Sequence, residues 1–123
     1  MRALIVDDSK TMRAIIARTI KELGFEILEA ANGKEALDTL KEYGAIELSL
    51  VDWHMPIMTG IEFVREVRSD PEYDSMKLMM VTTAADSEHV SEALCAGVDE
   101  YLMKPFNKDL ILSKLQMMGV VQC

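Results

Sequence analysis

The sequence predicts a three-layer α/β fold, in which a doubly wound sheet of five parallel strands is covered by five helices on its two faces. Short apolar runs alternate five times with amphipathic segments of helical length. This alternation indicates parallel strands joined by right-handed helical crossovers. Three of the runs are almost continuously apolar, which is typical of strands that are buried on both faces.

The five apolar runs are the predicted strands. In chain order they are Ala3–Val6, Phe25–Leu28, Leu48–Val51, Leu78–Val81 and Glu100–Met103. The second run continues as FEILE, which alternates apolar and charged residues. We therefore expect this run to form an edge strand with one drier face.

The predicted helices follow the strands one by one. They start at or after Ser9, Asn32, Thr59, Ser87 and Asn107, and the first four end at Gly24, Gly44, Asp70–Pro71 and Gly97. Small polar residues are favoured at helix starts and Gly at helix ends, and Pro stops a helix. At helical spacing, the residues expected to face the core are Met12, Ile15, Ile16, Ile20, Leu23, Ala36, Leu37, Leu40, Ile61, Phe63, Val64, Val67, Val90, Ala93, Leu94, Ile111, Leu112 and Leu115.

Length and charge exclude several classes of protein. The chain has 123 residues, so we expect residues 1–123 to form one domain. A net charge of −8 disfavours unaided binding to nucleic acid or to an anionic membrane. We expect a cytoplasmic protein, because the N-terminus lacks a signal-peptide pattern, no apolar stretch could span a bilayer, and Cys95 and Cys123 lack the spacing of a metal site.

Polar side chains end four of the five predicted strands. Asp7 and Asp8 follow the first strand, Asp52 the third, Thr82 the fourth and Lys104 the fifth. In an open parallel sheet, ligands bind beyond the carboxyl ends of the strands, at the point where the winding direction reverses. We therefore expect these side chains to meet at one edge of the sheet.

The repulsion between three carboxylates at one edge of the sheet must be offset by another group. At a separation of about 4 Å, each ionised pair repels by about 4 kcal/mol at an effective dielectric constant of about 20. A bound cation or proton uptake would relieve this repulsion, and carboxylates without His or Cys suit Mg²⁺ or Mn²⁺. Taken singly, these residues have simpler interpretations: Asp7 and Asp8 as helix caps, Thr82 as a strand former and Lys104 as a solvated side chain.

Four segments together resemble the receiver domain of two-component response regulators, in particular its single-domain chemotaxis type. They are VDDSKTMR (6–13), VDWHMPIMTG (51–60), MVTT (80–83) and YLMKPF (101–106). The resemblance covers the whole chain and implies a flavodoxin-like fold with strand order 2-1-3-4-5. It also implies a cis peptide bond between Lys104 and Pro105.

The resemblance assigns a role to each site residue. Asp52 matches the phosphorylated aspartate. Mg²⁺ would be bound by Asp8, Asp52 and the backbone carbonyl of His54, with Asp7 holding it through water. Thr82 and Lys104 match the groups that bind the phosphoryl oxygens, and Thr82 and Tyr101 match the switch pair.

By the same resemblance, the chain is a signalling switch that catalyses only its own phosphorylation and dephosphorylation. The donor would be a sensor histidine kinase or a phosphotransfer protein. The signal would leave through the fourth helix, fifth strand and fifth helix, which carry His89, Glu92, Tyr101 and Lys108. The downstream target would be another protein. Chemotaxis, where that target is the flagellar motor switch, is the commonest setting for proteins of this resemblance.

The sequence departs from the family pattern at Thr83, where Ala or Gly is usual, and at Thr59, which we expect to cap a helix. We also hypothesise that His54 and Ala84 tune the dephosphorylation rate. Three other functions remain open: a phosphatase of the haloacid dehalogenase type, an FMN-binding protein and an interaction module that is never phosphorylated. Adjacent rather than alternate acids after the first strand disfavour the phosphatase, and the acidic loop disfavours FMN.

Overall fold

The predicted sheet is confirmed by the computed structural model, which describes residues 1–44, 46–83 and 89–120. Its strands are β1 (Arg2–Val6), β2 (Glu26–Ala30), β3 (Leu48–Asp52), β4 (Lys77–Thr83) and β5 (Glu100–Lys104). They form one parallel sheet in the order β2-β1-β3-β4-β5, so β2 is an edge strand, as its alternation predicts. The winding direction reverses between β1 and β3, which puts the carboxyl ends of these two strands side by side.

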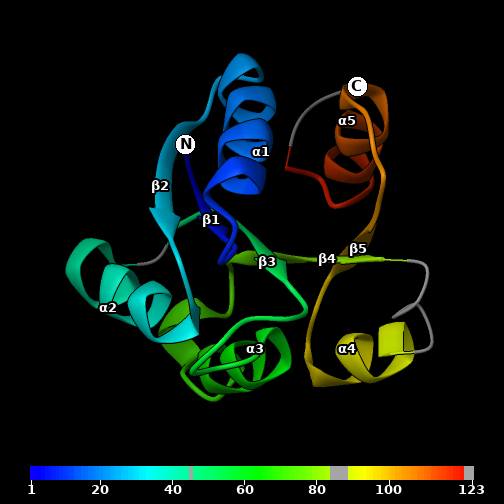
Figure 1. The fold of residues 1–123 in the computed structure, drawn as a ribbon. Helices are drawn as coiled ribbons and strands as arrows, with labels where there is room; N and C mark the ends of the chain where they lie inside the picture. Colours follow the sequence, from blue (N-terminus) through cyan, green and yellow to red (C-terminus); the bar gives the residue numbers. More distant parts are fainter. Residues whose placement is uncertain (45, 84–88, 121–123) are drawn as a thin grey trace.

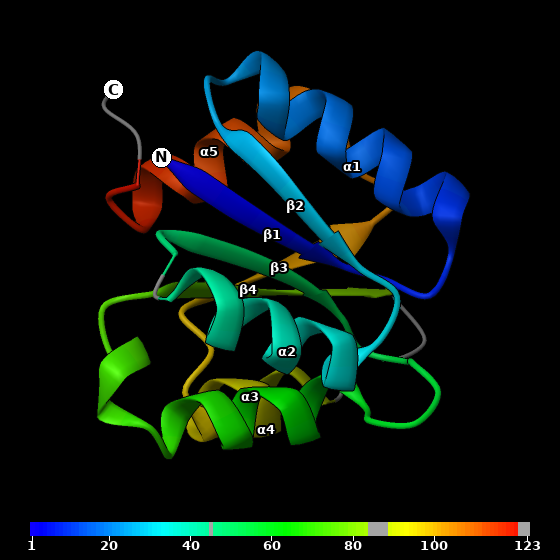
Figure 2. The same ribbon diagram turned by 90° about the vertical axis from the view of Figure 1, so that its left-hand side faces the viewer.

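In the described part of the chain, α-helices cover the two faces of the sheet (Figures 1 and 2). One layer contains α1 (Lys10–Glu22) and α5 (Lys108–Met117). The other contains α2 (Gly33–Tyr43), α3 (Gly60–Arg68) and α4 (Val90–Ala96). A short 3₁₀ helix, η1 (Pro71–Tyr73), lies in the connection that follows α3. None of the helices in the described part of the chain has the length and apolar character needed to cross a membrane.

Each face of the sheet packs on its own apolar cluster. Ile5 and Leu50 belong to the cluster under α1 and α5, which we call the α1/α5 cluster. Val6 and Val51 belong to the cluster under α2, α3 and α4, which we call the α3/α4 cluster. Successive strand residues point to opposite faces, so strands that contribute to both clusters must be apolar at every position.

The helix ends follow the predicted chemistry. The Ser9 and Asn107 side chains accept hydrogen bonds from backbone N–H groups in the first turns of α1 and α5. Thr59 forms a capping box with Glu62, as expected of a helix cap. Gly97 ends α4 in the left-handed region (φ 116°), where a side chain would be strained.

Ser87, the predicted start of the fourth helix, lies outside the described residues, and α4 itself begins at Val90 after His89.

Two residues predicted to face the core are exposed. Ile15 and Leu94 have relative exposures of 51% and 45%. The buried face of α1 passes through Ile16 and Ile20, and that of α4 passes through Ala93. Because neighbouring helix positions are about 100° apart, a residue next to the centre of the buried face can lie at the solvent boundary.

Candidate functional site

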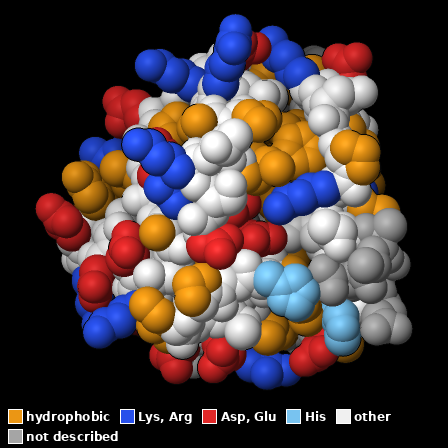
Figure 3. Space-filling model, in the orientation of Figure 1, with side chains coloured by type: hydrophobic (Ala, Val, Ile, Leu, Met, Phe, Trp, Pro, Cys, Tyr) orange, Lys and Arg blue, Asp and Glu red, His pale blue; other side chains and the backbone are white. Residues whose placement is uncertain are grey.

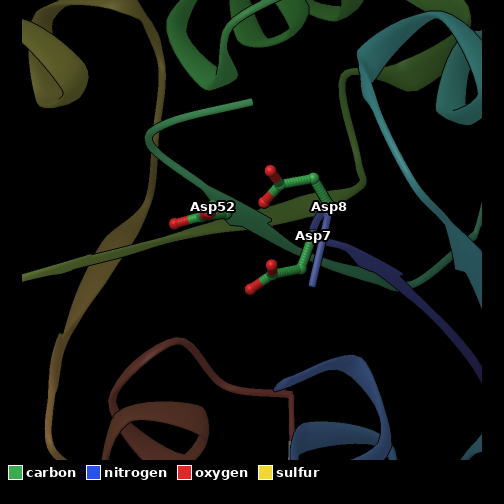
Figure 4. A group of neighbouring side chains, drawn as sticks. All are labelled: Asp7, Asp8 and Asp52. Atoms are coloured by element: carbon green, nitrogen blue, oxygen red, sulfur yellow. The ribbon is translucent and has the colours of Figure 1, made fainter. Parts of the chain in front are cut away.

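The three predicted acids meet at the carboxyl edge of the sheet. Asp7 and Asp8 follow β1, and Asp52 is the last residue of β3. One carboxylate oxygen from each residue lies within 4.8 Å of the others. Figure 4 shows the three side chains extending from neighbouring strand ends into the same space. In Figure 3, acidic side chains gather at the middle of this face, with a basic side chain beside them.

The strand alternation explains why two of these acids and Lys104 converge. In β1, β3 and β5, the residue two positions earlier faces the α1/α5 cluster: these residues are Ile5, Leu50 and Leu102. A period of two therefore directs Asp7, Asp52 and Lys104 toward that same face of the sheet. The apolar runs fix the register, and the polar residue at each strand end follows from it.

Lys104 compensates part of the negative charge. Its Nζ lies 3.5 Å from Asp52 Oδ1 and 3.7 Å from Asp7 Oδ2. The side chain of Lys104 is 21% exposed, and that of Asp52 is 13% exposed. The peptide bond between Lys104 and Pro105 is cis, as the resemblance implies. One ammonium thus faces two carboxylates, and the cluster of three acids keeps a net negative charge.

Asp7 is the most buried of the three acids, with a relative exposure of 1%. Its Oδ1 accepts a hydrogen bond from the Ser9 backbone N–H (2.8 Å). Its Oδ2 is buried and has no hydrogen-bond partner among the described residues. Burial raises the pKa of Asp7, although the hydrogen bond from Ser9 and the charge of Lys104 oppose that shift. A buried carboxylate oxygen without a donor is the kind of group that a bound cation satisfies.

The surroundings of Asp52 disfavour the ionised form of its carboxyl group. Burial and then the charge of Asp7 raise its pKa to about 6, against the lowering effect of Lys104. At neutral pH, Asp52 is therefore ionised at a free-energy cost to the fold. That cost falls when positive charge is added, because a nearby cation favours the ionised form.

The residues present fit a hard divalent cation. The cluster supplies carboxylate oxygens from Asp7, Asp8 and Asp52, with no His or Cys side chain in the group. Such oxygen donors suit Mg²⁺. The buried, unsatisfied Asp7 Oδ2 is the structural observation that supports this fit.

The loop between β3 and α3 fixes the position of the Asp52 backbone. Its ends are joined by a hydrogen bond from the Gly60 N–H to the Trp53 carbonyl (3.2 Å). A Cβ at position 60 would collide with the Asp52 carbonyl oxygen, so only Gly fits there. At the tip of the loop, the Met58 N–H bonds to the Pro56 carbonyl (2.7 Å), and Ile57 between them has φ 69°.

The remaining predicted residues lie on β4, on β5 and in the loop after β3. Thr82 is 3% exposed and lies near the end of β4, and the half-buried Thr83 ends that strand. Tyr101 is half-buried on β5 and packs against the α3/α4 cluster. His54 is exposed and lies in the loop two residues after Asp52. Its backbone carbonyl remains a predicted ligand of Mg²⁺. Ala84 lies outside the described residues.

The structure adds three groups that the sequence did not reveal. The Arg13 guanidinium donates to the Asp7 carbonyl oxygen (2.6 Å), which fixes the turn before α1. The rings of Trp53 and His89 are stacked, with centroids 4.9 Å apart. Lys114 lies over the Tyr101 ring. Each contact joins separate elements, so sequence spacing does not predict it. The exception is the contact of Arg13 with Asp7, because Arg13 lies only six residues later, on the helix that follows.

Comparison with known proteins agrees with this site. The response regulator receiver domain family matches residues 3–116. The chain is 43% identical to a chemotaxis protein CheY homolog of Campylobacter jejuni, over 94% of this chain and 90% of the relative. It is 41% identical to the chemotaxis protein CheY1 of Helicobacter pylori, over 94% of each chain.

Two solved structures have the same fold. The chemotaxis protein CheY4 of Vibrio cholerae superposes with a TM-score of 0.86 at 35% identity, covering 94% of this chain and 96% of that one. The receiver domain of a sensor histidine kinase from Pseudomonas aeruginosa PAO1 has a TM-score of 0.84 at 25% identity and covers 94% of each chain. That protein has a magnesium ion coordinated in its active site cleft. The chain described here belongs to the response regulator receiver domain family and is a phosphorylation-activated switch.

Proposed function

We propose that this protein accepts a phosphoryl group from a phosphohistidine onto Asp52. The observation that carries the proposal is the arrangement around Asp52, where a carboxylate at the end of a buried strand lies 3.5 Å from the Lys104 ammonium and beside two further acids. A pKa of about 6 leaves Asp52 largely ionised at neutral pH, as a nucleophile must be. The buried strand and the Gly60 loop hold it in place.

Phosphoryl transfer here is an in-line displacement. A carboxylate oxygen of Asp52 attacks the phosphorus atom opposite the phosphorus–nitrogen bond of the donor. The new phosphorus–oxygen bond forms as the phosphorus–nitrogen bond breaks, and the imidazole nitrogen keeps the electron pair and takes a proton from solvent. Water later attacks the acyl phosphate and releases inorganic phosphate. Catalysis of this kind depends mainly on positioning and electrostatic stabilisation.

The surrounding residues have distinct roles in this proposal. Asp7, Asp8, Asp52 and the backbone carbonyl of His54 would hold Mg²⁺. When bound, the ion would offset negative charge on the phosphoryl oxygens. The Lys104 ammonium would bind one of these oxygens, and its distance to Asp52 supports that role. The Thr82 hydroxyl, at the end of the neighbouring strand, would bind another.

The signal would leave through α4, β5 and α5. When Thr82 turns toward the phosphoryl group, space opens on the α3/α4 side of the sheet, and Tyr101 moves inward. The downstream partner is a protein that distinguishes these two states. The chemotaxis relatives support a role in chemotaxis. Within that role, we propose the flagellar motor switch as the target. We also propose that the protein acts in the cytoplasm and that residues 1–123 form one receiver domain. Its own phosphorylation and dephosphorylation would be the only reactions that it catalyses.

Incubation with acetyl phosphate and Mg²⁺, followed by intact-protein mass spectrometry, tests the proposal. The wild type should gain one phosphoryl group, and Asp52→Asn should gain none. Asp38→Asn is the matched control, because Asp38 is an exposed carboxylate on α2, and it should behave as the wild type. Phosphorylation that persists in Asp52→Asn, or repeated turnover of a phosphomonoester by the wild type, would contradict the proposal.

A further inference from the structure

A basic side chain from α5 is placed over the ring of Tyr101. The Lys114 Nζ lies 4.3 Å from the centroid of that ring. The same atom lies 3.2 Å from Glu100 Oε1, and the side chains of this ion pair are only 17% and 14% exposed. Glu100 Oε1 also accepts a hydrogen bond from the Tyr101 backbone N–H (3.0 Å). The ammonium is therefore fixed by an anion that is itself held beside Tyr101.

This contact passes around the edge of the sheet. Tyr101 lies beside Met80 in the β4–β5 ladder and packs against the α3/α4 cluster. The helix that carries Lys114 packs on the opposite face, through Ile111 and Leu115 in the α1/α5 cluster. Because β5 is an edge strand, the Lys114 side chain can reach past it to the Tyr101 ring.

Tyr101 also shares a face of the sheet with Thr82. In the β4–β5 register, Met80 pairs with Tyr101 and Thr82 pairs with Met103. Residues two positions apart point to the same face, so Thr82 and Tyr101 are diagonal neighbours on the α3/α4 side. A movement of Thr82 therefore changes the space that is open to the Tyr101 ring.

We propose that Lys114 is a positioning residue of the switch, which holds Tyr101 in its half-buried orientation and so opposes activation. The inference rests on the proposed function, in which Tyr101 moves inward when Asp52 is phosphorylated. Inward movement takes the ring away from an ammonium that Glu100 keeps in place. A cation–π contact at a partly exposed site shifts an equilibrium by about two- to fivefold. When the contact is removed, linkage raises the affinity for a ligand that binds only the inward state by up to the same factor, which is reached when the outward state predominates without ligand.

The probe is beryllofluoride with Mg²⁺, which mimics a phosphoryl group on a carboxylate. Its binding is followed by the fluorescence of Trp53, the single Trp, which directly follows Asp52. Lys114→Met keeps an apolar stem and removes the charge, so it should bind beryllofluoride about two- to fivefold more tightly than the wild type. Lys114→Arg keeps a cation that can lie on the ring, so its affinity should stay near the wild-type value.

A double-mutant cycle separates this contact from general effects. In a Tyr101→Leu background, Lys114→Met should lose the gain in affinity that depends on the ring, because no aromatic ring is present to be held. The change in net charge is the same in both backgrounds, so it cancels in the cycle. An unchanged or weaker affinity in Lys114→Met, or an equal effect with and without Tyr101, would overturn the proposal.

The orientation of the ring can also be measured without ligand. The Tyr101 ring resonances of the ligand-free Lys114→Met variant should move toward those of the beryllofluoride complex, and those of Lys114→Arg should not. Failure of the wild type to bind beryllofluoride would contradict the phosphorylation site on Asp52. In that case, Tyr101 resonances that are identical in ligand-free wild type and Lys114→Met would separately contradict the role of Lys114.

Discussion

Replacing Asp52 by Asn should stabilise the metal-free protein at neutral pH. The folded state raises the pKa of Asp52 to about 6 from its ordinary value of 3.8, first through burial and then through the charge of Asp7. A group whose pKa is raised by folding binds its proton more tightly in the folded state. Its ionisation therefore lowers the free energy of unfolding as the pH rises from about 4 through 6.

The magnitude follows from this shift. The rise from 3.8 to about 6 corresponds to about 3 kcal/mol, since each tenfold change in proton affinity is worth about 1.4 kcal/mol. Asp52 lies at the solvent-facing rim of the sheet, so screening by water reduces the effect. We therefore expect Asp52→Asn to raise the free energy of unfolding by about 1 to 2 kcal/mol at pH 7.5 without divalent cations. The amide keeps the shape of the side chain and removes only its charge.

Urea unfolding, followed by Trp53 fluorescence and circular dichroism, measures this difference. It should shrink as the pH falls toward 4, because the wild-type carboxyl is then protonated as well. Saturating Mg²⁺ should stabilise the wild type more than Asp52→Asn, since a ligand that binds the folded state adds to stability. A variant that is less stable than the wild type at pH 7.5 without metal, or a difference independent of pH, would refute the electrostatic reasoning.

Three further substitutions test the parts that support the site. Ile57→Gly should raise the free energy of unfolding by about 1 kcal/mol in thermal unfolding, because Ile57 is 77% exposed and holds a positive φ that Gly adopts without strain; a lower melting temperature would contradict this. Gly60→Ala should abolish phosphorylation by acetyl phosphate, because its Cβ would displace the Asp52 carbonyl; unaltered phosphorylation kinetics would show that the loop has room. Arg68→Met should cost about 2 to 4 kcal/mol in urea unfolding, because Arg68 donates to three backbone carbonyls and pairs with Asp99; a cost below 1 kcal/mol would refute its structural role.

The sequence predicted those parts of the fold and site that depend on strand order and alternation. Five apolar runs require five parallel strands, and the carboxyl ends of such strands lie at one edge. Asp7, Asp52 and Lys104 are three of the polar residues at those ends, and the period of two within each strand brings these three to one face. The strand order and the individual roles came from the resemblance to receiver domains.

Other features could not be predicted because they depend on side-chain positions across elements. Ile15 and Leu94 were misplaced because apolar spacing alone does not fix the centre of a helix's buried face to within one residue. The contact of Lys114 with Tyr101 joins a helix on one side of the sheet to a ring on the other, around an edge strand. Ile57 has a positive φ that an apolar β-branched residue does not indicate.

Calorimetric titration with Mg²⁺ at pH 7.5 tests the central claim, that Asp7, Asp8 and Asp52 together form a cation site beside the nucleophile. Asp8 is the exposed acid of the cluster, so Asp8→Asn removes one carboxylate with little disturbance to the core. We expect one Mg²⁺ per chain in the wild type and in the Asp38→Asn control, and at least tenfold weaker binding in Asp8→Asn. Absence of Mg²⁺ binding by the wild type, or equal affinity in Asp8→Asn, would contradict the account.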